Sequence, residues 1–178
     1  MLETIYNRKS VRRYTDEPIS EAIIQKILEA GMSGPSATNA RPWSFVVVTD
    51  EKKLNEMADA NMKYAEPLRK AKLAILVCGD LDRSCLDFWV IDCSIAAQNM
   101  TLAAEELGLG SVWLGVWPVE ERVKNQNQLF HLPENTVAHS ILVFGYPNDD
   151  ASIKKTKKIW EEGRVHYNDW NQEYEIKR

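Results

Sequence analysis

The stretch that decides the architecture is DFWVIDCSIAAQNMTLAAEELGLGSVWLGV, residues 87–116. From about Asp87 to Gly108 the apolar residues recur at helical spacing, which predicts a long helix. The next run, SVWLGV at 111–116, predicts a short buried strand, because β-branched and aromatic residues suit a pleated surface. Together these elements predict a sheet with a helix packed on it.

The predicted helix is apolar on two sides. One stripe consists of Trp89, Cys93, Ala96, Met100, Ala103 and Leu107. A second stripe begins with Ile91, Ile95 and Leu102. Two apolar sides need two surfaces to pack against, and one of these is the sheet. The other is either further core or the same helix of a second copy. The second copy is favoured, because a chain of 178 residues has few layers to spare.

Three further apolar runs predict strands, namely WSFVVV at 43–48, LAILVC at 73–78 and SILVFGY at 140–146. Their nearly continuous hydrophobicity indicates that both faces of the sheet are covered. Two more helices are predicted, one from a Ser20 N-cap to a stop at Gly31 and one capped by Asp50. We expect a single domain over residues 1–178, with an irregular tail from about Asn148.

Composition narrows the class of protein. Hydrophobic residues make up 44% and charged residues 27%, which is typical of a globular chain. A net charge of −4 argues against a nucleic-acid binder. The sequence shows neither a secretory signal pattern nor an apolar run long enough to span a membrane. Three cysteines without disulfide-framework spacing favour a reducing cytoplasm.

The sequence lacks the motifs of several common kinds of catalytic site. GLGSVWLG follows a helix and precedes a strand, the reverse of the dinucleotide-binding order. No phosphate-binding P-loop, G-x-S-x-G elbow or HExxH motif occurs. His131, His139 and His166 stand alone, without a partner at metal-ligand spacing, so neither a metal nor a catalytic side chain is predicted. If the protein is an enzyme, its chemistry belongs to a bound cofactor.

Two short segments carry candidate binding chemistry. In NRKSVRRY, an extended chain would place Arg8, Ser10 and Arg12 on one side, where two guanidinium groups flank a hydroxyl. Such a set can hold a phosphate, although surface charge is the simpler explanation. The second segment, GPSATNARPW at 34–43, is small and polar and leads directly into a core strand. By themselves these residues leave the ligand open.

Taken in order, four motif groups resemble the nitroreductase family of flavoproteins: RKSVRRY, GPSATNARPWSFVVV, DCSIAAQNMTLAAEELGLGSVWLG, and FGYP with RVHYNDW. The likeness covers nearly the whole chain in the family's order and spacing. It implies an α+β fold, a three-layer α/β/α sandwich around a central mixed, mostly antiparallel sheet. It also implies an intertwined homodimer in which the tail, residues 148–178, packs on the partner subunit.

The resemblance implies FMN sites at the dimer interface, built by both subunits. The implied contacts are Arg8, Lys9 and Ser10 on the phosphate, Arg12 near the N1/O2 edge of the ring, Pro35, Ser36, Ala37 and Asn39 from the other subunit, and Leu114 and Gly115 under the ring. A backbone N–H of Gly115 or its neighbour would reach N5 or O4, with a plain strand glycine as the alternative. Lys157, or else Lys155, would complete the phosphate site, where relatives often carry arginine.

The implied activity is transfer of hydride from NADH or NADPH through flavin N5 to a small acceptor, by a ping-pong mechanism. Family acceptors include nitroaromatics, quinones and flavins. Lys63, Tyr64, Trp117 and the rest of the 117–130 region are candidates for the acceptor pocket wall. Two alternatives stay open: another flavin reaction on this fold, such as enone reduction or dehalogenation, and a storage or sensor protein that binds FMN without turnover.

Overall fold

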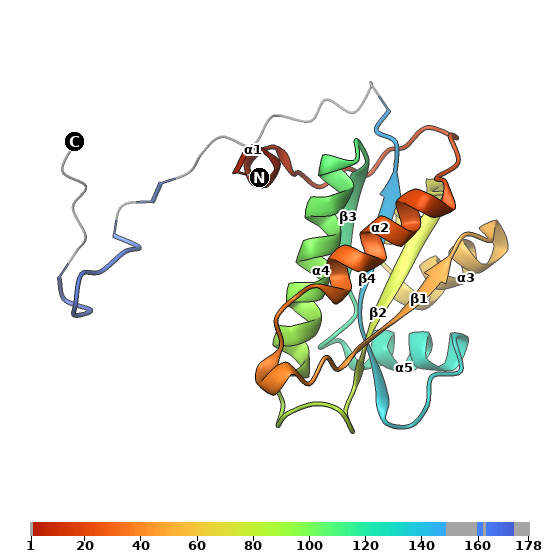
Figure 1. Cartoon of the computed structure of the whole chain (residues 1–178). Coiled ribbons are helices and arrows are strands. Elements are labelled where there is room, and N and C mark those ends of the chain that lie inside the picture. The colour runs from red at the N-terminus through yellow and green to blue at the C-terminus, as the bar shows by residue number, and fades with distance from the viewer. Residues whose placement is uncertain (1, 149–159, 162, 173–178) are drawn as a thin grey trace.

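A four-stranded sheet forms the centre of the protein in the computed structural model, which describes residues 2–148, 160–161 and 163–172 (Figure 1). Its strands are β1 (Trp43–Val48), β2 (Leu73–Asp80), β3 (Gly110–Gly115) and β4 (Thr136–Gly145). They lie in the order β1-β2-β4-β3, and every ladder is antiparallel. The parallel pairing among the described residues is an isolated bridge between Ser10 and Ser111.

Two long helices cover one face of the sheet. Helix α2 (Glu21–Met32) lies on α4 (Trp89–Glu106), and the inward stripe of α4 packs on the strands. Trp89, Cys93, Ala96 and Met100 from that stripe are buried with Ile75, Leu142 and Phe144 of β2 and β4. Burial of so many large apolar side chains is the main favourable term in folding.

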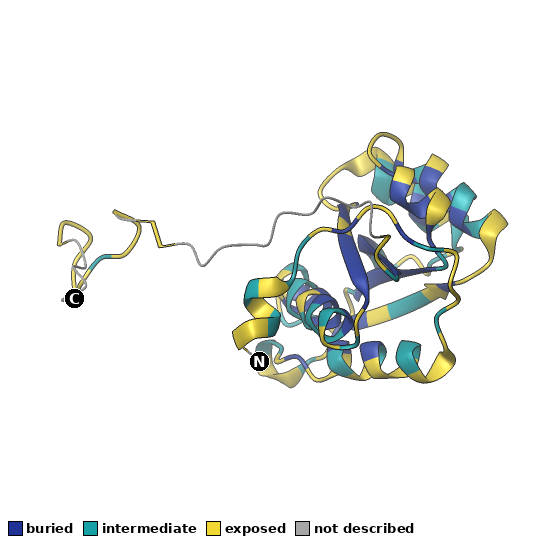
Figure 2. Ribbon diagram, turned by 90° about the horizontal axis from the view of Figure 1, so that it is seen from above, coloured by how far each residue is buried: buried dark blue, intermediate teal, exposed yellow. Residues whose placement is uncertain are grey.

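The opposite face is covered by α3 (Glu51–Asn61), the 3₁₀ helix η2 (Glu66–Lys70) and α5 (Glu120–Leu129). Leu54, Met57 and Leu68 pack there against Leu76 and Ile141 of the sheet. Figure 2 shows the resulting pattern, with buried residues on the strands and on the inward sides of the helices. The predicted three-layer α+β fold with a mostly antiparallel sheet is therefore confirmed.

Short sequence patterns predicted the positions of most helices and strands correctly. Asp50 caps α3, because its side chain accepts a 2.8 Å hydrogen bond from the Lys53 N–H. Gly31 was predicted as a helix stop, and that is wrong: α2 continues through it to Met32. A Cβ at Gly31 would lie 2.4 Å from Met100 Cε, so this glycine permits close approach of α2 to α4. Three short helices, α1 (Leu2–Asn7), η1 (Ala37–Asn39) and η2, were not predicted, and neither was α5.

The second apolar stripe of α4 is only partly covered by the described part of the chain. Ile91 is 54% exposed, and Ile95 and Leu102 are half-buried. Within the tail, the His166 ring stacks on Trp170 with centroids 4.3 Å apart. Lys155 and Lys157 lie outside the described residues. None of the described helices combines the length and apolar character needed to cross a bilayer.

Candidate functional site

The basic N-terminal segment, residues 8–12, runs along the free edge of β3. The Val11 N–H donates a 2.8 Å hydrogen bond to the Ser111 carbonyl, beside the Ser10–Ser111 bridge. Val11 itself is buried against Gly110, where a Cβ would come within 2.6 Å of it. The segment is therefore fixed through its backbone, while Ser10 and Arg12 remain exposed.

Both ends of this basic segment are anchored. At one end Arg8 follows α1, and its N–H donates to the Thr4 carbonyl at 2.9 Å. At the other end the buried Tyr14 hydroxyl donates to the Val11 carbonyl at 2.6 Å. Burial also raises the pKa of Tyr14 well above its ordinary value, so this phenol stays protonated as a donor. The predicted phosphate ligands Arg8, Lys9 and Ser10 are thus consecutive residues on a held backbone.

Gly115 ends β3 on the same free edge, about 13 Å beyond Ser111 at the ~3.3 Å rise of a strand. It is exposed, and a Cβ built there would meet no atom within 4 Å. Val116 has no exposed surface, and Leu114 faces the core with 8% exposed. Because Ser111 bonds outward to Val11 and Gly115 lies four residues further along the strand, the Gly115 N–H also points away from β4.

The loop at residues 35–41 has an unusual backbone. Thr38, Asn39 and Arg41 have φ values of 51°, 57° and 49°. These lie in the left-handed region, which residues other than glycine rarely adopt. Two bonds within the loop stabilise it: the Arg41 N–H donates to Ser36 Oγ, and Arg41 Nε donates to Asn39 Oδ1, both at 2.9 Å. The predicted ring contacts Pro35, Ser36, Ala37 and Asn39 therefore share one tightly folded loop.

Asp92, a buried residue of α4, anchors this loop. Its Oδ1 accepts a 3.0 Å hydrogen bond from the Ala37 N–H, and the side chain is only 2% exposed. Its position in the first turn of α4 favours a negative charge. Oδ2 has no partner within the described residues. Sequence reasoning missed this role, although a lone acid in an otherwise apolar helix segment was the signal that could have found it.

Helix α4 holds the two predicted halves of the site apart. Near its C-terminal end Glu106 accepts a hydrogen bond from Thr4 of α1, and near its start Asp92 binds Ala37. At 1.5 Å per residue these positions are roughly 21 Å apart. Figure 1 shows α1 and the η1 loop at opposite ends of the helix. Within one subunit, therefore, the structure does not bring residues 8–12 and 35–39 together.

A row of aromatic rings extends behind Gly115. His139 lies between Trp113 and Trp89, with ring centroids 5.8 and 6.1 Å away, and Trp117 packs edge-on against Trp89 at 5.1 Å. Burial lowers the pKa of His139 to about 4, so its ring is neutral near pH 7. Hydroxyls of Ser94 and Ser140 contact its two nitrogens at 3.2 and 3.0 Å. His139 thus has a structural role in a neutral cluster of aromatic rings. We call this cluster, which also contains Trp89, Trp113 and Trp117, the aromatic shelf.

Comparison with known proteins identifies the family of this chain. The profile of the Nitroreductase family matches residues 5–80 and 86–146. The chain belongs to the nitroreductase family. A "Putative NADH dehydrogenase/NAD(P)H nitroreductase" of Archaeoglobus fulgidus is 44% identical over 171 residues, covering 95% of this chain and 98% of the relative.

Solved structures of family members share the fold. A protein of the same description from Bacteroides thetaiotaomicron is 46% identical with a TM-score of 0.87, covering 94% of this chain and 96% of its own. A "putative nitroreductase" in complex with FMN from Desulfovibrio desulfuricans is 32% identical with a TM-score of 0.75, covering 88% and 91%.

Sequence reasoning also missed Arg122, in the first turn of α5. Its Nη1 donates a 2.9 Å hydrogen bond to the Gly115 carbonyl, which brings a guanidinium group to the open end of β3. An arginine in a polar helix is ordinarily surface charge, so no local pattern distinguishes it. The region 117–130, predicted to border the acceptor pocket, thus contributes a charged group next to the predicted ring contact.

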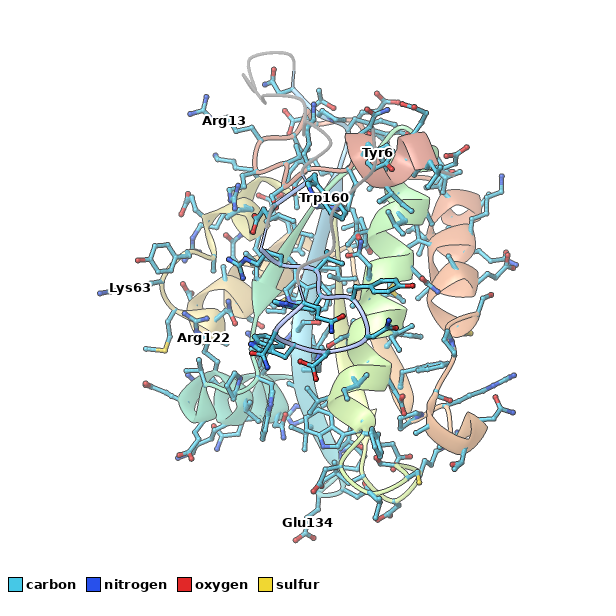
Figure 3. All side chains as sticks on the ribbon, turned by 90° about the vertical axis from the view of Figure 1, so that its left-hand side faces the viewer. Tyr6, Arg13, Lys63, Arg122, Glu134 and Trp160 are labelled. Atoms are coloured by element: carbon cyan, nitrogen blue, oxygen red, sulfur yellow. The ribbon has the colours of Figure 1, made fainter. Side chains whose placement is uncertain are left out.

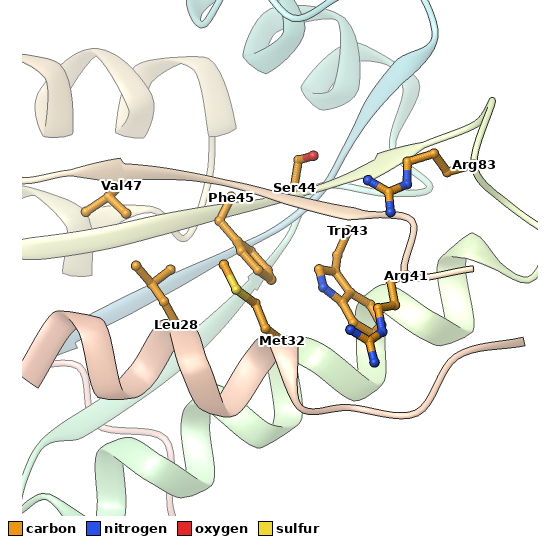
Figure 4. Close-up of a pocket in the computed structure, with 8 residues that line it drawn as sticks. All are labelled: Leu28, Met32, Arg41, Trp43, Ser44, Phe45, Val47 and Arg83. Atoms are coloured by element: carbon orange, nitrogen blue, oxygen red, sulfur yellow. The ribbon is translucent and has the colours of Figure 1, made fainter. Parts of the chain in front are cut away.

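A separate pocket of about 480 Å³ lies between α2 and β1 (Figure 4). Leu28, Met32, Phe45 and Val47 form its apolar part, and Arg41 and Arg83 lie with Trp43 toward one end. β1 and β3 are opposite edges of the sheet, so this pocket is distant from Ser10 and Gly115. It touches the predicted site only through Arg41, whose side chain binds Asn39.

Proposed function

We propose that this nitroreductase-family chain is an FMN-dependent NAD(P)H oxidoreductase that acts as a homodimer. Its relative from Archaeoglobus fulgidus carries the description "Putative NADH dehydrogenase/NAD(P)H nitroreductase", and the Desulfovibrio structure contains FMN. The observation that carries the proposal is the alignment of Ser10 and Gly115 on one strand edge. A phosphate group at the first and a ring edge at the second would lie along β3.

The residues present fit FMN chemically. Arg8, Lys9 and Ser10 provide cationic and hydroxyl donors for a phosphate, from a backbone held on β3. The exposed Gly115, with no atom near a Cβ, leaves room for a flat ring close to the backbone. The loop at 35–39 offers small and amide side chains suited to a polyol and a heterocycle.

When bound, FMN supplies a two-electron carrier that accepts hydride at N5 from NAD(P)H and delivers it to a small acceptor in a second half-reaction. The chain's own residues would bind and orient it. Arg8, Lys9 and Ser10 would hold the phosphate, Lys157 would add a point charge, and Arg12 would favour negative charge at the N1/O2 edge. No side-chain acid or base is required of the protein.

A homodimer would complete each site. Two copies packed through the second apolar stripe of α4, running in opposite directions, would bring residues 35–39 of one subunit to residues 8–12 of the other. Ile91 and Leu102 supply apolar surface for that contact. A cavity of about 550 Å³, bordered by Thr4, Asn99 and Leu102, lies along the same stripe. The tail from residue 148 would pack on the partner subunit.

An absorbance spectrum of the purified protein, followed by anaerobic addition of NADH and then NADPH, tests the proposal. About one flavin per subunit, bleached within seconds, would support a reductase and identify its donor. Flavin that stays oxidised would favour a storage or sensor protein. A colourless protein that takes up no added FMN would refute the proposed function. Reduced enzyme offered nitroaromatics, quinones, enones and halogenated aromatics would then separate the possible acceptors.

A further inference from the structure

Arg122 places a fixed positive charge at the open end of β3. Its Nη1 is held by the Gly115 carbonyl at 2.9 Å, which orients the planar guanidinium beside the outward-pointing N–H of the same residue. Its Nε is buried and has no partner in the described part of the chain. A buried donor without a partner is destabilising. A side chain placed only for stability would be expected to satisfy that donor.

No carboxylate neutralises this charge within the described residues. Glu120 and Glu121 occupy the same first turn of α5, but the ion pairs of the described chain do not include Arg122. Lys63, in the loop after α3, projects on the same side of the molecule (Figure 3). His139, which belongs to the aromatic shelf, is neutral near pH 7. The charge at this end of β3 is therefore positive.

Two partly exposed tryptophans lie in β3 and just after it, close in sequence to Gly115. Trp113 lies on the same face of β3 as Gly115 and is 36% exposed, and Trp117 is 42% exposed. Exposed tryptophans next to an open glycine favour planar aromatic ligands. A guanidinium held at that glycine favours a ligand that also carries a carboxylate, because its fork matches carboxylate geometry.

We propose that Arg122 is a specificity-determining residue that selects planar aromatic acceptors bearing a carboxylate or a similar anionic group. The proposal rests on the proposed function, since it places the acceptor beside a flavin that contacts Gly115. It makes the charge of the acceptor, rather than the type of reducible group, the property that this site recognises.

Benzoate and benzamide test the proposal by equilibrium binding, because they share a shape, differ in charge and are not reduced. Their dissociation constants would be measured from the change in flavin absorbance of the oxidised holoenzyme. In Arg122→Gln we expect benzoate binding to weaken about tenfold and benzamide binding by less than about twofold. With 4-nitrobenzoate and 4-nitrobenzamide as substrates, KM should show the same split.

Lys124→Gln is the matched control, because Lys124 is an exposed basic residue of the same helix and its loss changes the net charge equally. It should leave both dissociation constants unchanged. Arg122→Lys, which keeps the charge and loses the fork, should weaken benzoate about threefold and decides the matter if Arg122→Gln does not fold. Equal effects on benzoate and benzamide, or none, with FMN still bound would overturn the role of Arg122. A wild-type protein without FMN would overturn the proposed function as well.

Discussion

The basic segment at residues 8–12 and the loop at residues 35–41 are held by different means. The first is fixed through its backbone on the edge of β3, and Ser10 and Arg12 are exposed there. The second is fixed by Asp92, a buried side chain 55 residues away in the sequence, and contains three left-handed residues. A segment fixed by its backbone tolerates side-chain changes structurally, whereas the loop depends on the side chains of Asp92, Ser36 and Asn39.

The largest expected effect comes from Arg8→Ala, which removes a cation from the predicted phosphate site. We expect FMN affinity to fall about 100-fold, because a charge-assisted hydrogen bond contributes ~1.5–3 kcal/mol. Fluorescence titration of the apoprotein measures it. Arg13→Ala is the control, since Arg13 projects away from the body of the protein in Figure 3. Equal affinity in wild type and Arg8→Ala would remove Arg8 from the site.

Acid should weaken the scaffold that both regions share. His139 has a folded pKa of about 4 because it is buried, against about 6.5 when unfolded. Between these values the unfolded state binds the extra proton, so stability is lost as pH falls from about 6.5 to about 4. At pH 5 this amounts to on the order of 2 kcal/mol relative to pH 7. Urea unfolding at both pH values should show a smaller difference in His139→Gln; an identical difference would refute this assignment.

Asp92→Ala should disturb the loop without touching the basic segment. Loss of the acceptor removes the bond that holds the half-buried Ala37 N–H, which is worth about 1 kcal/mol, and we expect roughly fivefold weaker FMN binding. Asp92→Asn keeps an oxygen acceptor and should restore most of the affinity. If Ala and Asn variants bind FMN like wild type, the anchor does not position the predicted ring contacts.

Mixing subunits of two variants gives the smallest change in FMN binding. It tests directly whether the two regions serve one site from different subunits. Arg8→Ala and Asn39→Ala each weaken FMN binding if both regions serve the same site. When the two variants are unfolded and refolded together, about half of the dimers are mixed, and one of the two sites in each mixed dimer is wild type. About a quarter of all sites should therefore regain wild-type affinity. Recovery of tight FMN binding measures this fraction. No recovery, with mixed dimers present, would mean that each site uses residues of one subunit only.

Much of the fold follows from local patterns. Four apolar runs and the two-sided helix predicted all four strands and α4, because periodicity within a few residues reports which faces are buried. The Gly31 stop was wrong, because a glycine also permits helix contact, and only Met100 on a distant helix shows which role applies. Helix α5 was too polar to carry a strong periodic signal.

For the candidate site, sequence reasoning identified the segments but not what holds them. The alternation of Arg8, Ser10 and Arg12 is visible because neighbouring residues share one backbone. Neither the Asp92–Ala37 bond nor the Arg122–Gly115 bond has a local signature, since each joins elements whose meeting depends on the whole fold.

The amino-acid sequence by itself determined the layers, the strands and the family resemblance, because burial and hydrogen-bonding patterns repeat over short distances along the chain. Tertiary structure alone decided that Gly115 is the accessible residue at the end of β3, that Asp92 anchors the loop, and that α4 separates residues 8–12 from residues 35–39. These are properties of distances between remote parts of the chain, and only packing fixes such distances.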